Sequence, residues 1–256
     1  MQLIFDIGNT NTVIAIYQKS KIIDTWRIAT VLNRTVDEYC GYFKIFFSEY
    51  RSFDEIIIGS VVPDVTSNIK LACKKSLTSK VYIANDDFKI NFPSKVDNSN
   101  EIGADRLVNA LSAWHEFNKS AIVVDFGTAT TFDVISNSGI YLGGVIAPGI
   151  NLSLEALNNA AARLPRIAIS KPRKVIGSNT VGAMNSGIFW GYVGLINTVI
   201  NKIQVELNYD TIKIATGGLA QFFSKEMEKD VIIRENLTID GLYLAYNYYN
   251  KKKNEK

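Results

Sequence analysis

The chain contains two kinds of hydrophobic pattern, and they follow one another in the same order in both halves. In the first half, short runs rich in β-branched residues predict strands near residues 2–7, 11–18, 21–28, 55–58 and 80–84. Apolar residues spaced three or four positions apart predict helices near 35–50, from Pro63 onward and near 104–117. Thr35 and Glu38 have the spacing of a capping box, which supports the first of these helix starts.

The second half repeats this order. We expect strands near 120–125, 129–136, 139–146, 212–215 and 231–233. We expect helices near 151–163, from about residue 178, after Gly218, and up to Tyr249. Three strands followed by alternating helices and strands, twice over, predict a duplicated α/β protein. The expected divisions are an N-terminal domain at 1–117, a C-terminal domain at 118–250 and a flexible basic tail at 251–256.

Composition supports a folded enzyme rather than a nucleic-acid or membrane protein. Hydrophobic residues make up 47% of the chain, enough for a substantial core. The net charge of +3 comes from the tail, and the rest of the chain has as many acidic as basic residues, so a DNA-binding surface is not expected. Residues 175–201 carry no charge, but their glycines and polar side chains suit a helix buried in protein, including against a second subunit, better than a membrane span. Asp6 interrupts the first apolar run, so no signal peptide is expected.

Cysteine and histidine offer little chemistry. Cys40 and Cys73 are far apart in the sequence, lie in helical patterns and lack metal-binding spacing, so both are expected to be buried thiols in a reducing compartment, the cytoplasm. His115 has no nucleophile motif beside it, and a single histidine excludes a His-rich zinc site.

The candidate site comes from a motif that occurs twice. Residues 4–12 and 123–131 each consist of an apolar run, then Asp-x-Gly, then small polar residues, and each is followed by a second strand-like run. A strand, a tight turn and a returning strand fit both copies. Backbone amides and hydroxyls in such a turn can bind phosphate, and an aspartate at the strand end can bind a cation. Two facing turns would hold one nucleotide polyphosphate between two domains, which predicts phosphoryl transfer.

These residues belong to a longer series of motifs that resembles the type III pantothenate kinases, within the actin, sugar-kinase and heat-shock ATPase superfamily. The resemblance covers nearly the whole chain. Its ordered blocks are Asp6-Ile7-Gly8-Asn9-Thr10, Gly103-Ala104-Asp105-Arg106, Asp125-Phe126-Gly127-Thr128-Ala129-Thr130-Thr131, Gly143-Gly144-x-Ile146-x-Pro148-Gly149, Gly177-x-x-Thr180-x-x-Ala183-x-x-Ser186-Gly187 and Thr216-Gly217-Gly218. It implies a duplicated ribonuclease H-like, actin-like ATPase fold with a nucleotide cleft between its two domains.

The resemblance implies ATP with Mg²⁺ and a monovalent cation, K⁺ or NH₄⁺. The residues implied to bind ATP and its phosphates are Asp6, Ile7, Gly8, Asn9, Thr10, Asn11, Thr12, Val13, Thr128, Gly217 and Gly218. Asp6 would lie near Mg²⁺, through water, and Asp125 would bind the monovalent cation. The structural alternative for Gly217-Gly218 is a simple turn between strand and helix.

The residues implied to bind the acceptor substrate are Gly103, Ala104, Asp105, Arg106 and Thr180. Asp105 would be the general base, and Arg106 could bind the pantothenate carboxylate. As structural alternatives, Asp105 and Arg106 could pair to cap the 104–117 helix, and Thr180 could cap its own helix. Many family members have a tyrosine shortly before the second block. Here that place falls on Phe92 or Val96, so the pocket wall can differ.

The function implied by the resemblance is ATP-dependent phosphorylation of pantothenate to 4′-phosphopantothenate, the first step of coenzyme A synthesis, by a homodimer. The chain has no Gly-x-x-x-x-Gly-Lys-[Ser/Thr] sequence, which argues against a P-loop kinase. Two alternatives stay open: a non-catalytic nucleotide-binding regulator of the same fold, or another enzyme of the superfamily, such as a sugar kinase or polyphosphate hydrolase.

Overall fold

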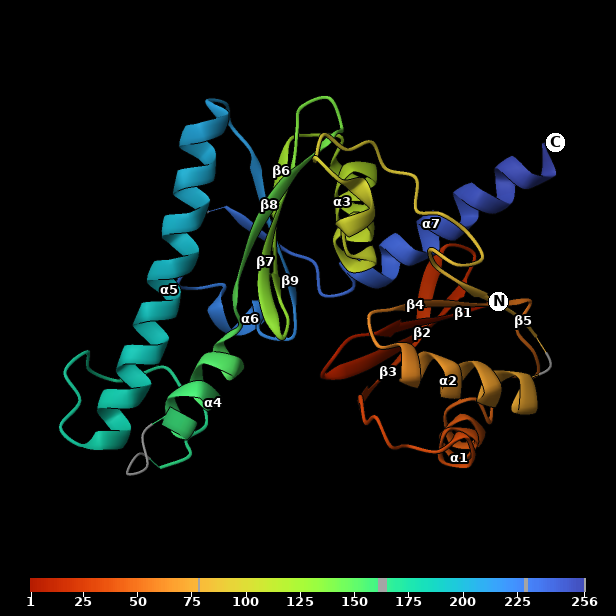
Figure 1. Ribbon diagram of the computed structural model, residues 1–256, viewed down its shortest axis with the longest axis horizontal. Coiled ribbons are helices and arrows are strands. Elements are labelled where there is room, and N and C mark those ends of the chain that lie inside the picture. The colour runs from red at the N-terminus through yellow and green to blue at the C-terminus, as the bar shows by residue number, and fades with distance from the viewer. Residues whose placement is uncertain (78, 161–164, 228–229, 256) are drawn as a thin grey trace. The chain divides into compact units, whose positions relative to one another are not determined.

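The computed structural model describes residues 1–77, 79–160, 165–227 and 230–255, which form two compact units (Figure 1). Unit 1 consists of Met1–Glu116 and Asn236–Lys256, and unit 2 consists of Phe117–Glu235. No helix of the described ranges is both long and apolar enough to span a membrane.

The sheet of unit 1 has the strand order β3-β2-β1-β4-β5. The strands are β1 (Gln2–Ile7), β2 (Asn11–Gln18), β3 (Lys21–Ala29), β4 (Glu55–Ser60) and β5 (Lys80–Ile83). The first three strands pair antiparallel, and β4 and β5 then add in parallel on the other side of β1. Strand β1 is therefore central, between the antiparallel β2 and the parallel β4.

Helices cover both faces of this sheet. They are α1 (Val36–Phe46), α2 (Pro63–Ser76), α3 (Ala104–Phe117) and α7 (Leu237–Asn254), with a short 3₁₀ turn at Ser99–Glu101. Alternation along β1 sends Leu3 and Phe5 into the core shared with α1 and α2, and Ile4 into the core shared with α3 and α7. The expected capping box at Thr35 is present, and Pro63 begins α2, as predicted.

Unit 2 repeats the plan of unit 1. Its sheet has the order β10-β9-β6-β7-β8. The strands are β6 (Ala121–Phe126), β7 (Ala129–Ile135), β8 (Tyr141–Pro148), β9 (Ile212–Gly217) and β10 (Val231–Ile233), and the helices are α4 (Ile150–Ala160), α5 (Thr180–Leu207) and α6 (Ala220–Phe223). Directions match strand for strand, with β6 in the place of β1. The predicted duplication and the α/β class are both confirmed.

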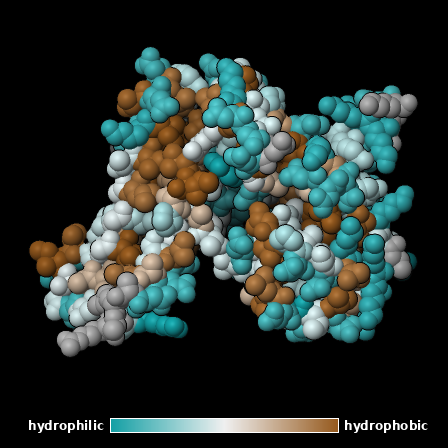
Figure 2. Space-filling model, in the orientation of Figure 1, coloured by the Kyte–Doolittle hydropathy of each residue, from teal (hydrophilic) through white to brown (hydrophobic). Residues whose placement is uncertain are grey.

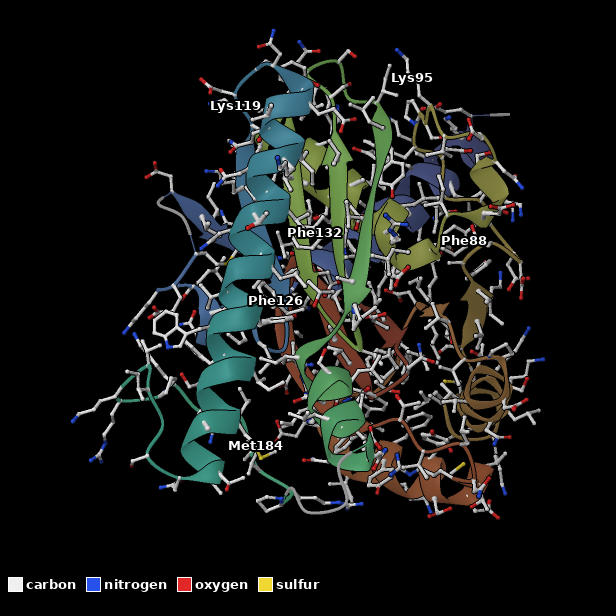
Figure 3. The ribbon with its side chains drawn as sticks, turned by 60° about the vertical axis from the view of Figure 1, so that its left-hand side comes forward. Phe88, Lys95, Lys119, Phe126, Phe132 and Met184 are labelled. Carbon is white, nitrogen blue, oxygen red and sulfur yellow. The ribbon has the colours of Figure 1, made fainter. Side chains whose placement is uncertain are left out.

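One core of unit 2 lies between its sheet and α5. Ile122, Val124 and Phe126 project from alternate positions of β6 toward Phe189 and Ile196 of α5. Figure 3 shows Phe126 and Phe132 of the sheet beside this long helix. Helix α5 thus packs along the strand that ends at the second Asp-x-Gly motif.

The last helix differs from the sequence-based division. Residues 118–250 were expected to form the second domain, but α7 packs against β1 and β4 and is grouped with unit 1. Its tyrosines explain the placement: the Tyr243 ring stacks on Tyr17 at 4.3 Å, and the Tyr246 hydroxyl donates to Glu55 at 2.7 Å. The helix also continues through Asn254, past the expected start of the tail at residue 251. The end of the expected 151–163 helix lies outside the described residues.

Candidate functional site

The first Asp-x-Gly turn joins β1 to β2. Asp6 is the next-to-last residue of β1 and pairs with Val13, while Ile7 is buried in the core and pairs with Thr12. The Gly8 amide donates to the Asn11 carbonyl at 3.0 Å, which closes the turn. Asn9, Thr10 and Asn11 are exposed at its tip. The expected phosphate-binding residues of unit 1 therefore form one continuous segment, of which residues 9–11 face solvent while Ile7 and Thr12 are buried.

The second turn, between β6 and β7, is one residue shorter. Here the Gly127 amide donates to the Ala129 carbonyl at 3.1 Å, across two positions instead of three. Matching the motifs residue by residue pairs Thr12 with Thr131, but the strand register pairs Ile7 with Thr12 and Phe126 with Thr130. Thr12 and Thr130 are therefore the equivalent residues, and both are fully buried.

The structure brings two of the expected residues of unit 2, Asp125 and Gly217, together. Gly217 has a φ of +89°, and a Cβ there would lie 2.6 Å from Oδ1 of Asp125, so only glycine lets the end of β9 approach that carboxylate. Thr128 lies at the exposed tip of the turn, and Gly218 is exposed next to Gly217. The positive φ and the close approach also suit a simple turn between strand and helix, so a nucleotide contact at Gly217-Gly218 stays a prediction.

Gly149 is a site residue for which the sequence suggested no role, although it ends one of the quoted blocks. Its amide donates to the Thr128 carbonyl at 3.1 Å, and a Cβ on Gly149 would lie 2.2 Å from that oxygen. The start of α4 is therefore packed directly on the second turn. The Pro148-Gly149 pair before a helix was the available signal.

The Gly103–Arg106 block forms the start of α3. The Asp105 carboxylate accepts a hydrogen bond from the Arg106 amide at 2.9 Å, and a Cβ on Gly103 would lie 2.4 Å from the same carboxylate oxygen. Gly103, Asp105 and Arg106 are all half-buried. A backbone amide and a glycine thus fix the orientation of the Asp105 carboxylate, which remains partly open to solvent.

Thr180 is the first residue of α5 and is exposed. The helix is capped by Asn179, whose side chain accepts from the Gly182 amide at 2.8 Å. The alternative in which Thr180 caps its own helix is therefore wrong, because Asn179 already does so.

The candidate metal positions suit cations that are shared with a ligand. Among the described residues, no group of three or more His, Cys, Asp and Glu side chains could hold a metal ion. Mg²⁺ in nucleotide sites is commonly bound by one or two carboxylates together with phosphate oxygens and water. A single carboxylate at each turn, Asp6 or Asp125, fits that pattern.

The two cysteines, His115 and Phe92 all make packing or hydrogen-bond contacts within unit 1. Cys40 and Cys73 are free and buried, as expected, and burial raises the pKa of the Cys73 thiol well above its usual range. His115 Nδ1 lies 2.8 Å from the Tyr248 hydroxyl, which joins α3 to α7. Phe92 packs against the unit 1 core that includes Phe88, so it is at least partly a core residue.

Comparisons with known proteins agree on one family. The family model of type III pantothenate kinases matches residues 2–202. A type III pantothenate kinase of Acidiphilium cryptum (strain JF-5) is 45% identical over 248 residues, 95% of this chain and 93% of that protein. One from Halalkalibacterium halodurans is 42% identical over 250 residues, 96% of this chain and 98% of that protein.

Solved structures identify the fold. A conserved protein from Campylobacter jejuni, proposed to be a Baf family transcriptional activator, has a TM-score of 0.62 at 21% identity and covers 97% of this chain and 99% of its own. A proposed N-acetylmannosamine kinase from Listeria monocytogenes has a TM-score of 0.54 at 14% identity, with 98% and 99% covered. These likenesses, with the two matching five-stranded sheets, establish the expected duplicated actin-like fold.

Proposed function

We propose roles for individual residues in the reaction of this protein. The chain belongs to the type III pantothenate kinase family. The reaction is ATP-dependent phosphorylation of pantothenate in coenzyme A biosynthesis, and the product is 4′-phosphopantothenate. The observation that carries the residue assignments is the placement of Asp6, Asp105 and Asp125. Two end central strands at tight turns, and the third begins a helix with its carboxylate held by a backbone amide.

Asp105 is the general base in this proposal. Its Oδ1 accepts a hydrogen bond from the Arg106 amide. The other oxygen can accept the proton of the pantothenate hydroxyl while the hydroxyl oxygen attacks the γ-phosphorus of ATP in line. The proton moves to Asp105, and ADP leaves. Arg106 next to it is suited to the pantothenate carboxylate, because a guanidinium binds a carboxylate with two parallel hydrogen bonds. The exposed Thr180 hydroxyl is a further contact for pantothenate, the substrate that accepts the phosphoryl group.

The two turns position ATP. Exposed amides and hydroxyls of residues 9–11 suit the phosphates, and Asp6 suits the water shell of Mg²⁺. Thr128 contacts the phosphates from the second turn, and the exposed Gly218, next to Gly217, lets the nucleotide come close to the backbone after β9. When bound, Mg²⁺ neutralises charge that develops on the phosphoryl oxygens. The protein acts mainly by positioning the reacting groups, and positioning is the main source of catalysis in phosphoryl transfer.

Asp125 is the proposed ligand of a monovalent cation, K⁺ or NH₄⁺. Its carboxylate lies beside Gly217, and the hydroxyls of Thr128 and Thr131 belong to the same turn and strand. Oxygen donors of this kind suit hard cations. A positive charge here would add to the electrostatic stabilisation of the transferring group.

We further propose a cytoplasmic homodimer in which α5 contributes to the subunit boundary. Gly187, Gly191 and Gly194 are exposed on α5, and a Cβ at any of them would meet no atom within 4 Å. Exposed small residues allow a second helix to approach closely. The two free, buried cysteines are consistent with a reducing compartment.

A turnover assay tests the activity directly. The purified protein is supplied with MgATP and either pantothenate or a panel of sugars, and ADP release is measured in potassium buffer. We expect ADP release that depends on pantothenate and a product of pantothenate plus one phosphoryl group. ADP release with a sugar only, or none with any acceptor, would contradict the proposal and favour another superfamily kinase or a non-catalytic nucleotide-binding protein.

A further inference from the structure

Different parts of the fold hold the two phosphate turns in place through the buried threonine at the base of each turn. In unit 1, the buried Thr12 hydroxyl lies 2.9 Å from the Thr30 hydroxyl, and the Thr30 amide donates to the Thr10 carbonyl at 2.9 Å. Thr30 directly follows β3, so the first turn is held by its own sheet.

In unit 2, the equivalent threonine is held by a distant helix. The buried Thr130 hydroxyl forms a hydrogen bond with the hydroxyl of Tyr192, near the middle of α5 and 62 positions along the chain. Ile150, the first residue of α4, belongs to the same buried core cluster as Tyr192. Tyr192 therefore joins α5 to the strand that leaves the second turn.

Packing leaves the Tyr192 ring little freedom. Its centroid lies 6.2 Å from the Phe126 ring, at the end of β6, and 5.0 Å from the Phe223 ring, in α6. Because Phe126 and Thr130 pair across the base of the turn, Tyr192 contacts both strands on which the turn stands. Burial raises the pKa of the Tyr192 hydroxyl, so it stays protonated and can donate at neutral pH.

We propose that Tyr192 is a positioning residue for phosphoryl transfer: its hydroxyl fixes the second phosphate turn to α5, so that Asp125 and Thr128 keep the placement that MgATP requires. This rests on the proposed roles of Asp125 and Thr128. It adds that α5, whose first residue is the proposed acceptor contact Thr180, also sets the geometry of the phosphate site. Within the described ranges, Thr12 of the first turn hydrogen-bonds to Thr30, after β3, and to no helix.

Tyr192→Phe is the first test, because it removes one oxygen and keeps the ring packing. Loss of a buried hydrogen bond is typically worth about 1 kcal/mol, or roughly a fivefold change in an equilibrium or rate. We expect titration calorimetry to show MgATP binding weakened about five- to tenfold, kcat lowered to a similar degree, and the KM for pantothenate within about twofold of wild type.

Tyr141→Phe is the matched control. Tyr141 is also buried and also donates to a side chain of β7, Asp133, at 2.8 Å, but its partner lies three residues farther from the turn. We expect a lower melting temperature with MgATP affinity and kcat per folded enzyme unchanged. Should Tyr192→Phe fold poorly, Thr130→Val removes the same hydrogen bond from the other side and should give the same kinetic split.

The double variant Tyr192→Phe/Thr130→Val separates positioning from stability. Replacing both partners by apolar groups commonly restores stability, since no buried polar atom is left unpaired. Under our proposal the melting temperature recovers but MgATP affinity and kcat stay low. Wild-type binding and turnover in Tyr192→Phe, or recovery of activity together with stability in the double variant, would overturn it. Because MgATP binding is measured without acceptor, this outcome is independent of whether pantothenate is the substrate.

Discussion

At the scale of single residues, Asp105 makes the clearest prediction. Asp105→Asn keeps an oxygen that can accept from the Arg106 amide, so the fold and MgATP binding should persist. The amide cannot take the substrate proton, and loss of a general base typically lowers kcat on the order of 10²- to 10⁴-fold. Steady-state kinetics with pantothenate, alongside calorimetry with MgATP, measure the two effects separately.

Asp64→Asn is a suitable control for this change. Asp64 is the second residue of α2, as Asp105 is of α3, but it is exposed and belongs to no proposed site. It should leave kcat unchanged. Turnover of Asp105→Asn close to that of Asp64→Asn would remove the catalytic role of Asp105.

Asp125 predicts a cation requirement. With Asp125 as a ligand, activity should be high in potassium or ammonium chloride and weak in sodium chloride at the same ionic strength. Asp125→Asn should be slow in all three salts, because the neutral amide holds a cation less well. Initial rates in the three salts measure this. Equal wild-type rates in sodium and potassium would contradict the role.

At the scale of single residues, the sequence could predict a role only where the motif lay within one short segment. Asp6 and Asp125 were found because Asp-x-Gly after an apolar run is a pattern within one short segment. The equivalence of Thr12 with Thr130 was missed, because it depends on a one-residue difference in turn length that only the strand register reveals. Tyr192 was missed because its partner is distant in the chain.

At the scale of elements, the start of α4 is rigidly coupled to the second turn. Gly149→Ala would place a Cβ 2.2 Å from the Thr128 carbonyl and 2.7 Å from that of Gly127, so backbone must move. A displacement of about 1 Å in a positioned site can lower the rate by up to about 100-fold. We expect a kcat lowered roughly 10- to 100-fold, with weaker MgATP binding.

Gly41→Ala provides the comparison for Gly149→Ala. A Cβ at Gly41, in the middle of α1, meets nothing within 4 Å, and alanine in a helix interior is favoured over glycine by roughly 0.5–1 kcal/mol. We expect slightly higher thermal stability and normal kinetics. If Gly149→Ala behaves like Gly41→Ala, the contact between α4 and the turn does not contribute to catalysis.

The elements themselves were largely predictable, but their grouping was not. Period-two runs and helical spacing gave most strands and helices to within a few residues, because alternation records which side chains are buried. The assignment of α7 to unit 1 required the pairing of Tyr17 with Tyr243 and of Glu55 with Tyr246, contacts between segments more than 190 positions apart. No pattern inside α7 encodes that choice of partner.

At the scale of the whole molecule, α5 suggests why the chain should form a dimer. A helix confined to the core of one subunit would have its glycines against neighbouring side chains. Instead, Gly187, Gly191 and Gly194 are exposed. The preceding segment adds exposed apolar side chains, 66% for Val175 and 87% for Ile176, and Figure 2 shows hydrophobic surface there. An apolar surface next to a glycine-lined helix face suits a second copy of the chain.

Gly191→Leu tests this dimer. A bulky residue here does not overpack the core of the subunit, since a Cβ at Gly191 has open space around it. The variant should therefore fold, with a helix made slightly more stable, by up to about 1 kcal/mol. In a dimer that uses this face, leucine would hold the partner away, so light scattering should detect a shift toward monomer, and the KM for pantothenate should rise because Thr180 starts the same helix.

Gly41→Leu, at an exposed helical glycine of α1 that also has open space, should change neither property. A wild-type protein that is monomeric and active at assay concentration, or a Gly191→Leu variant with the wild-type mass in solution, would show that α5 does not form the subunit boundary.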